Sequence, residues 1–283
     1  MCKLLACDLD GTLFYPRKVK KCISKKNIKF LQKWYDAGNK IVLVTSRSAN
    51  FTEKLKDEIE RPFDVINCTS SQIYHDGNLI RNVSIPNKKL KTILDKIDEK
   101  YKPLGLLMTT KNYPVVIKNL NRAGKFLFLL VRIWNFFQFS YREKSVIDNN
   151  IFDQEILNGE IHKVILFFGF GKKKSFLAKE INKELRENFP EIESSWTMYV
   201  NELTPKNCNK GFGLKYYCEH IGFHKDDVYV VGDSGNDIQM FNEFHEHSYC
   251  MAHAYPSVKK YAKHVITRVH KLGKLVLKGE NNK

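Results

Sequence analysis

Short apolar runs alternate with helical patterns in the first part of the chain. The run Leu4–Cys7 ends at an acidic loop that contains a glycine, and Ile28–Tyr35 then repeats apolar residues at helical spacing before Gly38. The run Ile41–Val44 follows. This order predicts a βαβ unit with buried, parallel strands and a right-handed crossover.

The same pattern returns near the other end of the chain. The apolar run Val228–Val231 leads into a second acidic loop, and Ser248–Met251 is the last clear strand pattern. A short strand is also expected at Asp64–Asn67. In open α/β sheets, ligands bind at the carboxyl ends of the strands. The residues that follow each run are therefore the candidates for chemistry.

The first of these strand ends carries two carboxylates. Asp8 and Asp10 lie two residues apart, so both side chains point the same way on a continuing strand, and Gly11 lets the backbone turn closely around a bound group. Two crowded carboxylates are unfavourable unless a cation lies between them or one holds a proton. Oxygen ligands of this kind suit Mg²⁺. On its own, this short pattern is as typical of a solvated turn.

Further polar side chains stand at other strand ends and at one helix start. Thr45 and Ser46 follow the second run, and Lys210 begins an expected helix. Asp233 and the pair Asn236-Asp237 follow Val228–Val231. Because the strands are parallel, all these positions are expected at one edge of the sheet.

This ordered set resembles the four short motifs of the haloacid dehalogenase (HAD) superfamily, and the resemblance is closest to the Cof-type sugar-phosphatase-like branch. The matching positions are Asp8 with Asp10, Thr45, Lys210, and Asp233 with Asn236 and Asp237. The resemblance implies an α/β fold with a Rossmann-like doubly wound parallel-sheet core, formed by residues 1–82 and 201–283. Residues 83–200, which mix helical and strand patterns, are expected to form an inserted α+β cap domain that selects the substrate.

The resemblance also implies a role for each residue. Asp8 is the nucleophile that attacks phosphorus to form an aspartyl-phosphate, and Asp10 protonates the leaving oxygen and then activates water. Thr45 and Lys210 contact the phosphate oxygens. The implied cofactor is Mg²⁺, and its site consists of Asp8, Asp10 through its backbone carbonyl, Asp233 and Asp237. The remaining candidates for substrate or phosphate binding are Gly11, Ser46, Arg47 and Asn236.

The sequence departs from the usual pattern of this branch in three places. Ser46 stands where a glycine is usual, Ser70–Gln72 replaces an Asn-Gly-Ala segment, and His253 replaces an asparagine after the last core strand. None of these changes removes a carboxylate or Lys210. They therefore concern the fit of the substrate more than the chemistry.

Composition limits the partners of this 283-residue chain, which has 43% hydrophobic residues and a net charge of +16. The length suits one large domain or two modest ones. The positive charge attracts phosphate esters, nucleic acid or anionic lipid, but lysines occur throughout the chain, which is typical of a solvated surface. We expect a small phosphorylated metabolite as the partner and no specific nucleic acid.

Seven scattered cysteines without metal-binding spacing indicate neither a disulfide framework nor a zinc site. The chain shows no secretory leader pattern and no apolar run of about 18 residues, so a cytoplasmic location is expected. The apolar stretch 126–139 is expected to be a cap helix, with a membrane contact or a dimer surface as alternatives. The oligomeric state stays open.

The sequence thus favours a Mg²⁺-dependent phosphatase of small metabolites such as a sugar phosphate, flavin mononucleotide or pyridoxal phosphate. A phosphohexomutase-like phosphoryl transfer is an alternative, because those relatives also keep the acid at Asp10. A basic membrane- or nucleic-acid-associated protein on a HAD scaffold is a second alternative. The intact set of carboxylates, Thr45 and Lys210 argues against it, because a scaffold without chemistry has little reason to concentrate those charges.

Overall fold

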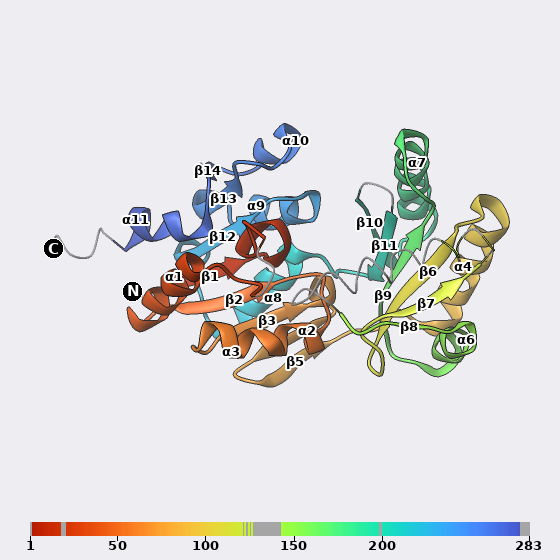
Figure 1. The fold of residues 1–283 in the computed structure, drawn as a ribbon, viewed down its shortest axis with the longest axis horizontal. Coiled ribbons are helices and arrows are strands. Elements are labelled where there is room, and N and C mark those ends of the chain that lie inside the picture. The colour runs from red at the N-terminus through yellow and green to blue at the C-terminus, as the bar shows by residue number, and fades with distance from the viewer. Residues whose placement is uncertain are drawn as a thin grey trace. The chain divides into compact units, whose positions relative to one another are not determined.

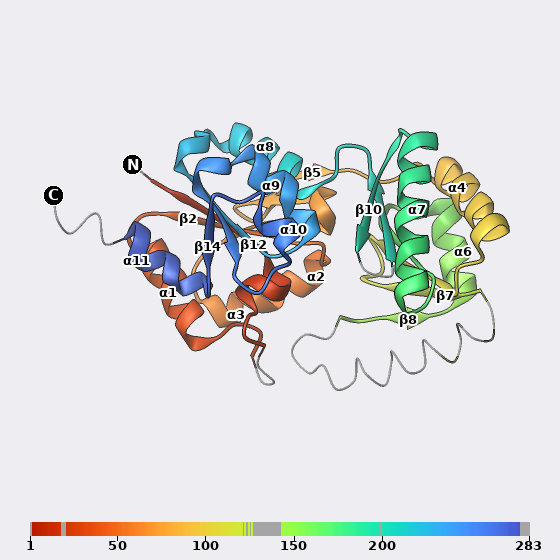
Figure 2. The same ribbon diagram turned by 90° about the horizontal axis from the view of Figure 1, so that it is seen from above.

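The computed structural model describes residues 2–17, 21–120, 122, 124, 126, 143–197 and 200–277. The chain divides into two compact units (Figures 1 and 2). The unit made of Met1–Arg81 and Asn209–Lys283 is called the core unit here, and the unit made of Asn82–Cys208 is called the insert unit. The chain therefore leaves the core unit once and returns to it once.

The core unit is built on an eight-stranded sheet in the order β14-β13-β12-β1-β2-β3-β4-β5. In chain order, its strands are β1 (Leu4–Cys7), β2 (Lys40–Val44), β3 (Asp64–Asn67), β4 (Gln72–His75), β5 (Asn78–Asn82), β12 (Val228–Gly232), β13 (Ser248–Met251) and β14 (His264–Ile266). The strands from β14 to β3 are parallel, and β4 runs antiparallel to β3. The buried parallel strands predicted from the apolar runs are confirmed.

Helices cover both faces of this sheet (Figure 1). They are α1 (Lys25–Asp36), α2 (Ala49–Thr52), α3 (Lys56–Ile59), α8 (Lys210–Ile221), α9 (Ile238–Glu243), α10 (Pro256–Lys259) and α11 (Leu272–Val276). On one face, Leu4 and Val42 share an apolar cluster with Leu214 of α8. On the other face, the ring of Trp34 in α1 lies 5.7 Å from the ring of Tyr229 in β12. The doubly wound α/β class predicted from the sequence is therefore confirmed.

The insert unit contains a six-stranded sheet in the order β10-β11-β9-β6-β7-β8. Its strands are β6 (Gly105–Thr110), β7 (Val116–Asn119), β8 (Val146–Ile147), β9 (Ile161–Phe167), β10 (Ile192–Thr197) and β11 (Val200–Pro205), and its helices are α4 (Asn87–Tyr101), α6 (Asn149–Asn158) and α7 (Lys172–Asn188). Ile93, Phe152 and Ile181, one from each helix, join Leu106 and Leu203 of the sheet in one buried cluster. The three helices therefore cover the same face of the sheet, which is an α+β arrangement.

The return to the core unit differs from the sequence-based prediction. The sequence pattern predicts this return at residue 201, but the structure keeps residues 201–208 in the insert unit. The reason is β11, which pairs antiparallel with both β9 and β10 and so continues the insert sheet.

The apolar stretch 126–139 falls almost entirely outside the described residues. Only Phe126 is described, and its side chain is exposed. Within the described part of the chain, no helix combines the length and the apolar character needed to span a membrane.

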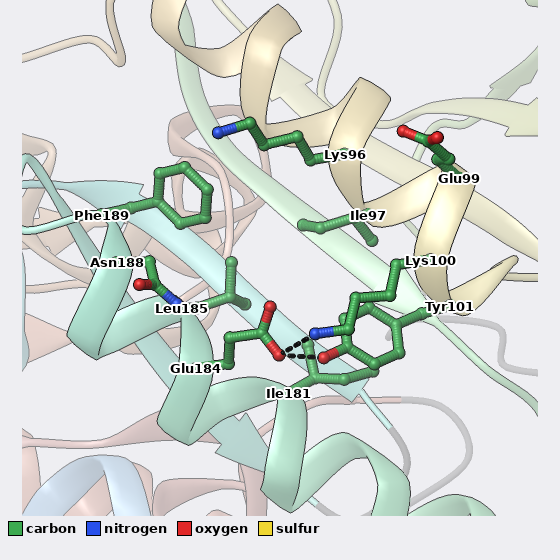
Figure 3. Close-up of a pocket in the computed structure, with 10 residues that line it drawn as sticks. All are labelled: Lys96, Ile97, Glu99, Lys100, Tyr101, Ile181, Glu184, Leu185, Asn188 and Phe189. Atoms are coloured by element: carbon green, nitrogen blue, oxygen red, sulfur yellow. Dashed lines mark hydrogen bonds and ion pairs between the residues drawn. The ribbon is translucent and has the colours of Figure 1, made fainter.

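A hollow of about 610 Å³ lies between α4 and α7 in the insert unit (Figure 3). Glu184 of α7 accepts a hydrogen bond from Lys100 Nζ at 2.7 Å and another from the Tyr101 hydroxyl, both from α4. These donors lower the pKa of Glu184. The contacts tie the two helices together across an otherwise mainly apolar seam that includes Ile97 and Leu185.

Candidate active site

The candidate catalytic residues lie at one edge of the core sheet. Strand β1 pairs in parallel with β2 on one side and with β12 on the other (Figure 1). Asp8, Thr45 and Asp233 directly follow these three strands. The backbone N–H of Asp8 extends the ladder by donating to the carbonyl of Val231 at 3.0 Å. The structure therefore brings the first, second and last sequence motifs to the same place.

Lys210 joins two carboxylates of this edge. It is the first residue of α8, where the side chain of Asn209 caps the helix by accepting the N–H of Phe212 at 2.9 Å. Lys210 Nζ donates to Asp8 Oδ1 and to Asp237 Oδ1, both at 2.6 Å. All three charged side chains are buried. Because buried charges need partners of opposite sign, these contacts fix the position of the Asp8 carboxylate.

Burial and mutual repulsion disfavour the ionised forms of the carboxylates at this site. Burial raises the pKa of Asp8, Lys210 opposes this rise, and the carboxylates of Asp237 and Asp233 add to it. Burial opposes the charge of Lys210, but Asp237 and Asp8 outweigh this effect and raise its pKa. Burial and Asp237 also raise the pKa of Asp233. A cation at this position would relieve the repulsion and favour the ionised carboxylates.

Asp237 orients the acidic loop after β12. Its Oδ2 accepts the backbone N–H groups of Asp233 and Ser234, each at 2.9 Å, while its Oδ1 accepts from Lys210. A Cβ on Gly232 would lie 2.5 Å from Cγ of Asp237, so only glycine leaves room for this carboxylate. Because both of its oxygens are engaged, Asp237 acts mainly as a positioning residue for Asp233 and Lys210.

Gly11 and Thr12 control the position of Asp233. Gly11 has a φ of +81°, and a Cβ there would lie 2.2 Å from Asp233 Oδ2. The hydroxyl of Thr12 donates to Asp233 Oδ1 at 3.1 Å. The glycine of the first motif is thus required both by its backbone conformation and by the close approach of the Asp233 carboxylate.

The carboxylates of Asp8, Asp233 and Asp237 fit a divalent cation. One oxygen from each lies within 4.8 Å of the others. Asp8 Oδ2 is buried and has no hydrogen-bond partner in the structure, although Oδ1 of the same carboxylate is held by Lys210. With all groups ionised, three carboxylates and one ammonium leave two negative charges. Hard oxygen ligands with this net charge suit Mg²⁺.

Asp10 and Arg47 form an ion pair at the mouth of the same edge. Arg47 Nε donates to Asp10 Oδ2 at 2.6 Å, and Nη2 donates to Oδ1 at 2.7 Å. The guanidinium lies 3.9 Å from the centre of the Phe51 ring. The side chain of Asp10 is 54% exposed, whereas that of Arg47 is 16% exposed. Asp10 is therefore the accessible member of the pair, and Arg47 is held by packing.

The other expected residues lie in the same loops. Thr45 is buried, and its hydroxyl accepts the backbone N–H of Arg47 at 3.1 Å. Ser46 lies between them and is half-buried. Asn236 Oδ1 accepts the hydroxyl of Ser234 at 2.7 Å, which places it within the acidic loop. These contacts order the loops around the carboxylates.

Sequence reasoning did not assign a role to Thr12 or to His253. Thr12 belongs to the first motif, so its position next to the carboxylates was a usable indication. His253 Nε2 lies 3.6 Å from Asp233 Oδ2, and its ring packs 4.0 Å from that of Tyr15. The one indication in the sequence was that His253 stands where this branch usually has an asparagine.

A second group of acidic side chains in the core unit is already satisfied. Asp64 Oδ2 contacts His75 Nδ1 at 2.8 Å and accepts the Tyr217 hydroxyl. Asp64 Oδ1 accepts the N–H of Asp76 at 2.8 Å. These bonds explain the cluster as a support for the hairpin of β4 and β5.

Comparison with known proteins identifies the family. The family model described as haloacid dehalogenase-like hydrolase matches residues 5–273. The chain is similar to two 5-amino-6-(5-phospho-D-ribitylamino)uracil phosphatases of Bacillus subtilis, YwtE and YcsE. It is 26% identical to YwtE over 276 residues, which cover 91% of this chain and 90% of YwtE. It is 24% identical to YcsE over 243 residues, which cover 85% of this chain and 80% of YcsE.

A solved HAD/COF-like hydrolase from Plasmodium vivax has a similar fold, with a TM-score of 0.78 and 21% identity over 100% of this chain and 96% of that chain. The family match spans both units and all of the acidic motifs. The chain therefore belongs to the haloacid dehalogenase-like hydrolases.

Proposed function

We propose that the protein is a Mg²⁺-dependent phosphatase that hydrolyses phosphate monoesters of small metabolites through an aspartyl-phosphate on Asp8. The observation that carries this proposal is the state of the Asp8 carboxylate. One oxygen is fixed by Lys210 at 2.6 Å, while the other is buried and has no hydrogen-bond partner. A carboxylate held in this way, next to a site that fits a cation, is suited to nucleophilic attack.

In the proposed reaction, an oxygen of Asp8 attacks the phosphorus of the ester. The new Asp8–phosphorus bond forms as the bond from phosphorus to the alcohol oxygen breaks. Asp10, which must have left Arg47 and carry a proton when this step begins, gives that proton to the alcohol oxygen. In the second step, Asp10 takes a proton from water as the water oxygen attacks phosphorus. The bond to Asp8 then breaks, which releases phosphate and restores the carboxylate.

Asp8, Asp233 and the backbone carbonyl of Asp10 would hold Mg²⁺, with Asp237 orienting them. The ion, when bound, supplies positive charge that offsets the negative charge of the carboxylates and of the phosphoryl group. Lys210 fixes Asp8 and adds a second positive charge. Thr45 supplies a hydroxyl at the next strand end.

The ion pair between Asp10 and Arg47 suggests how a phosphate ester would enter. Asp10 must reach the leaving oxygen, so its carboxylate must exchange Arg47 for the substrate. Arg47 would then donate its N–H groups to phosphate oxygens. A guanidinium binds a phosphate as well as it binds a carboxylate. Because Asp10 is the more exposed partner, this exchange needs little rearrangement of packed side chains.

The proposed substrates are esters of sugar-like alcohols. The two Bacillus relatives act on a phosphorylated ribityl chain. The insert unit, which has its own core, is proposed as the cap that selects the alcohol and limits the access of water. The cysteines are all free thiols, which fits a reducing compartment, so we propose that the esters belong to the cytoplasmic pool.

The test is phosphate release from a panel of phosphorylated metabolites, including sugar phosphates, flavin mononucleotide, pyridoxal phosphate and the ribityl substrate of the relatives. We expect turnover with Mg²⁺ and none with a chelator. The product analysis also distinguishes the alternative reaction, because a phosphohexomutase would return an isomerised ester with no net phosphate. An isomerised ester as the main product would overturn the proposal.

A further inference from the structure

The core unit contains a second hollow that is unusually basic. It measures about 1010 Å³ and lies between the start of α1 and the segment that joins β14 to α11. Six basic side chains line it: Lys21, Lys25, Lys26, Arg268, His270 and Lys271. No carboxylate lines the described part of this hollow, which is called the basic hollow below.

The fold concentrates positive charge at this place from two directions. Ser24 caps α1 by accepting the N–H of Asn27 at 3.3 Å, and the first turn that follows carries Lys25 and Lys26 and no acidic residue. The N-terminal end of a helix is itself positive, and acidic residues are the ones that stabilise it. Two lysines here are unfavourable on their own, and Lys271 adds its charge from the C-terminal segment.

The positive charge of the hollow affects the pKa of His270. The Asn27 side chain donates to the carbonyl of Leu13 at 2.9 Å, so its Oδ1 faces His270 Nδ1 at 3.0 Å and accepts a hydrogen bond from it. His270 Nε2 is therefore the atom that gains a proton. Burial lowers the pKa of His270, and the cations Lys271, Lys26, Arg268 and Lys274 lower it further.

Glu58 lies next to the basic hollow but does not fully neutralise its positive charge. Both carboxylate oxygens of Glu58 accept backbone N–H groups, from Cys22 and Ile23, at 2.9 Å each. Glu58 thus supports the wall of the hollow at Ile23. One carboxylate also cannot balance the several cations that line the cavity.

We propose that the basic hollow is a second anion site of the core unit, separate from the aspartate site, and that it binds a compact polyphosphate such as inorganic pyrophosphate or the phosphate chain of a nucleotide. Its concave shape suits a small ligand, because residues with six basic side chains line one volume. The Arg268 guanidinium is held in place, since it lies 4.4 Å from the centre of the Tyr15 ring and its Nη1 donates to the carbonyl of Thr267 at 2.7 Å. Pro16 and Ile23 supply apolar wall for the part of a ligand that is not phosphate.

The test measures pyrophosphate binding to the full chain by calorimetry at low salt and without divalent metal. Under these conditions the carboxylates of the aspartate site repel an anion, so binding there is suppressed. The double variant Lys26→Gln/Lys271→Gln should bind pyrophosphate at least about tenfold more weakly than the wild type. The control Lys33→Gln/Lys225→Gln removes the same charge from exposed lysines that do not line the hollow, and it should bind within about twofold of the wild type.

A second measurement needs no variant. The imidazole of His270, followed by NMR in the wild-type protein, should show a higher pKa when pyrophosphate is present, because a nearby anion favours the protonated ring. An unchanged His270 titration at saturating pyrophosphate would overturn the proposal. Equal weakening in both double variants would also overturn it, as would binding of a DNA oligonucleotide or of anionic vesicles without binding of pyrophosphate.

Discussion

The substitution Gly11→Ala separates backbone strain from the geometry of the site. Gly11 and Gly38 have nearly equal φ angles, +81° and +82°. A side chain in this left-handed region costs about 1–2 kcal/mol. Nothing lies within 4 Å of the position that a Cβ would take on Gly38, so Gly38→Ala should lose this amount of stability and keep its activity.

Gly11→Ala adds a second effect. Its Cβ would lie 2.2 Å from Asp233 Oδ2, whereas an ordinary contact begins at 3.4 Å, so the carboxylate must move by about an ångström. This atom ends a side chain, which can turn aside, so the added cost in stability should stay small. The cost in function should be large, because Mg²⁺ requires nearly ideal oxygen geometry. A displacement of about 1 Å costs on the order of 10²-fold in activity.

The assay compares both variants with the wild type by urea unfolding and by Mg²⁺-dependent phosphate release from an aryl phosphate. We expect similar losses of stability and a loss of kcat/KM of about 10²-fold in Gly11→Ala alone. If the two variants hydrolyse the ester equally well, the close approach of Gly11 to Asp233 has no functional role and the reasoning fails.

Three further predictions concern charge and burial. Lys210→Met should destabilise the protein by about 3–5 kcal/mol in urea unfolding, because it leaves buried carboxylates without a counter-charge, whereas Lys215→Met, which breaks an exposed ion pair, should cost less than about 1 kcal/mol. The folded-state pKa values of Asp8 and Asp233 are raised above the ordinary 3.8, so the folded protein binds these protons more tightly. The thermal stability of the metal-free protein should therefore fall as pH rises from 3.8 through the raised values, and Mg²⁺ should remove this fall, whereas an Mg²⁺-independent slope would contradict the metal site. Ellman's reagent should modify Cys2 rapidly in the native protein, because it is the exposed thiol and the other cysteines are buried; rapid reaction of further thiols would show that the core opens easily.

Most of the parallel strands of the core unit were predictable from the sequence because they are buried on both faces, although β14 at the edge is largely exposed. Leu4–Cys7 is apolar throughout and forms β1 over the same residues, and Val228–Val231 lies within β12. The carboxyl ends of adjacent parallel strands must meet at one edge, which is why Asp8 and Asp233 come together as expected. This inference needed only local patterns and one rule of sheet topology.

Contacts between residues far apart in the sequence were harder to predict. Nothing in the local sequence shows that Lys210 links Asp8 to Asp237, since Lys210 lies 202 positions after Asp8 in the chain. The pairing of Arg47 with Asp10 likewise depends on how Phe51 packs against the guanidinium. The return to the core unit was predicted too early because the antiparallel pairing of β11 is set by distant partners.

In the proposed mechanism, Asp8 carries the phosphoryl group during a Mg²⁺-dependent hydrolysis. The most direct measurement is acid quenching during turnover of a phosphate-labelled ester, followed by detection of labelled protein and of released phosphate, in the wild type and in Asp8→Asn. We expect a labelled, base-sensitive phosphoenzyme and metal-dependent phosphate release in the wild type, and a loss of both by at least about 10³-fold in Asp8→Asn. Undiminished phosphate release by folded Asp8→Asn would contradict it.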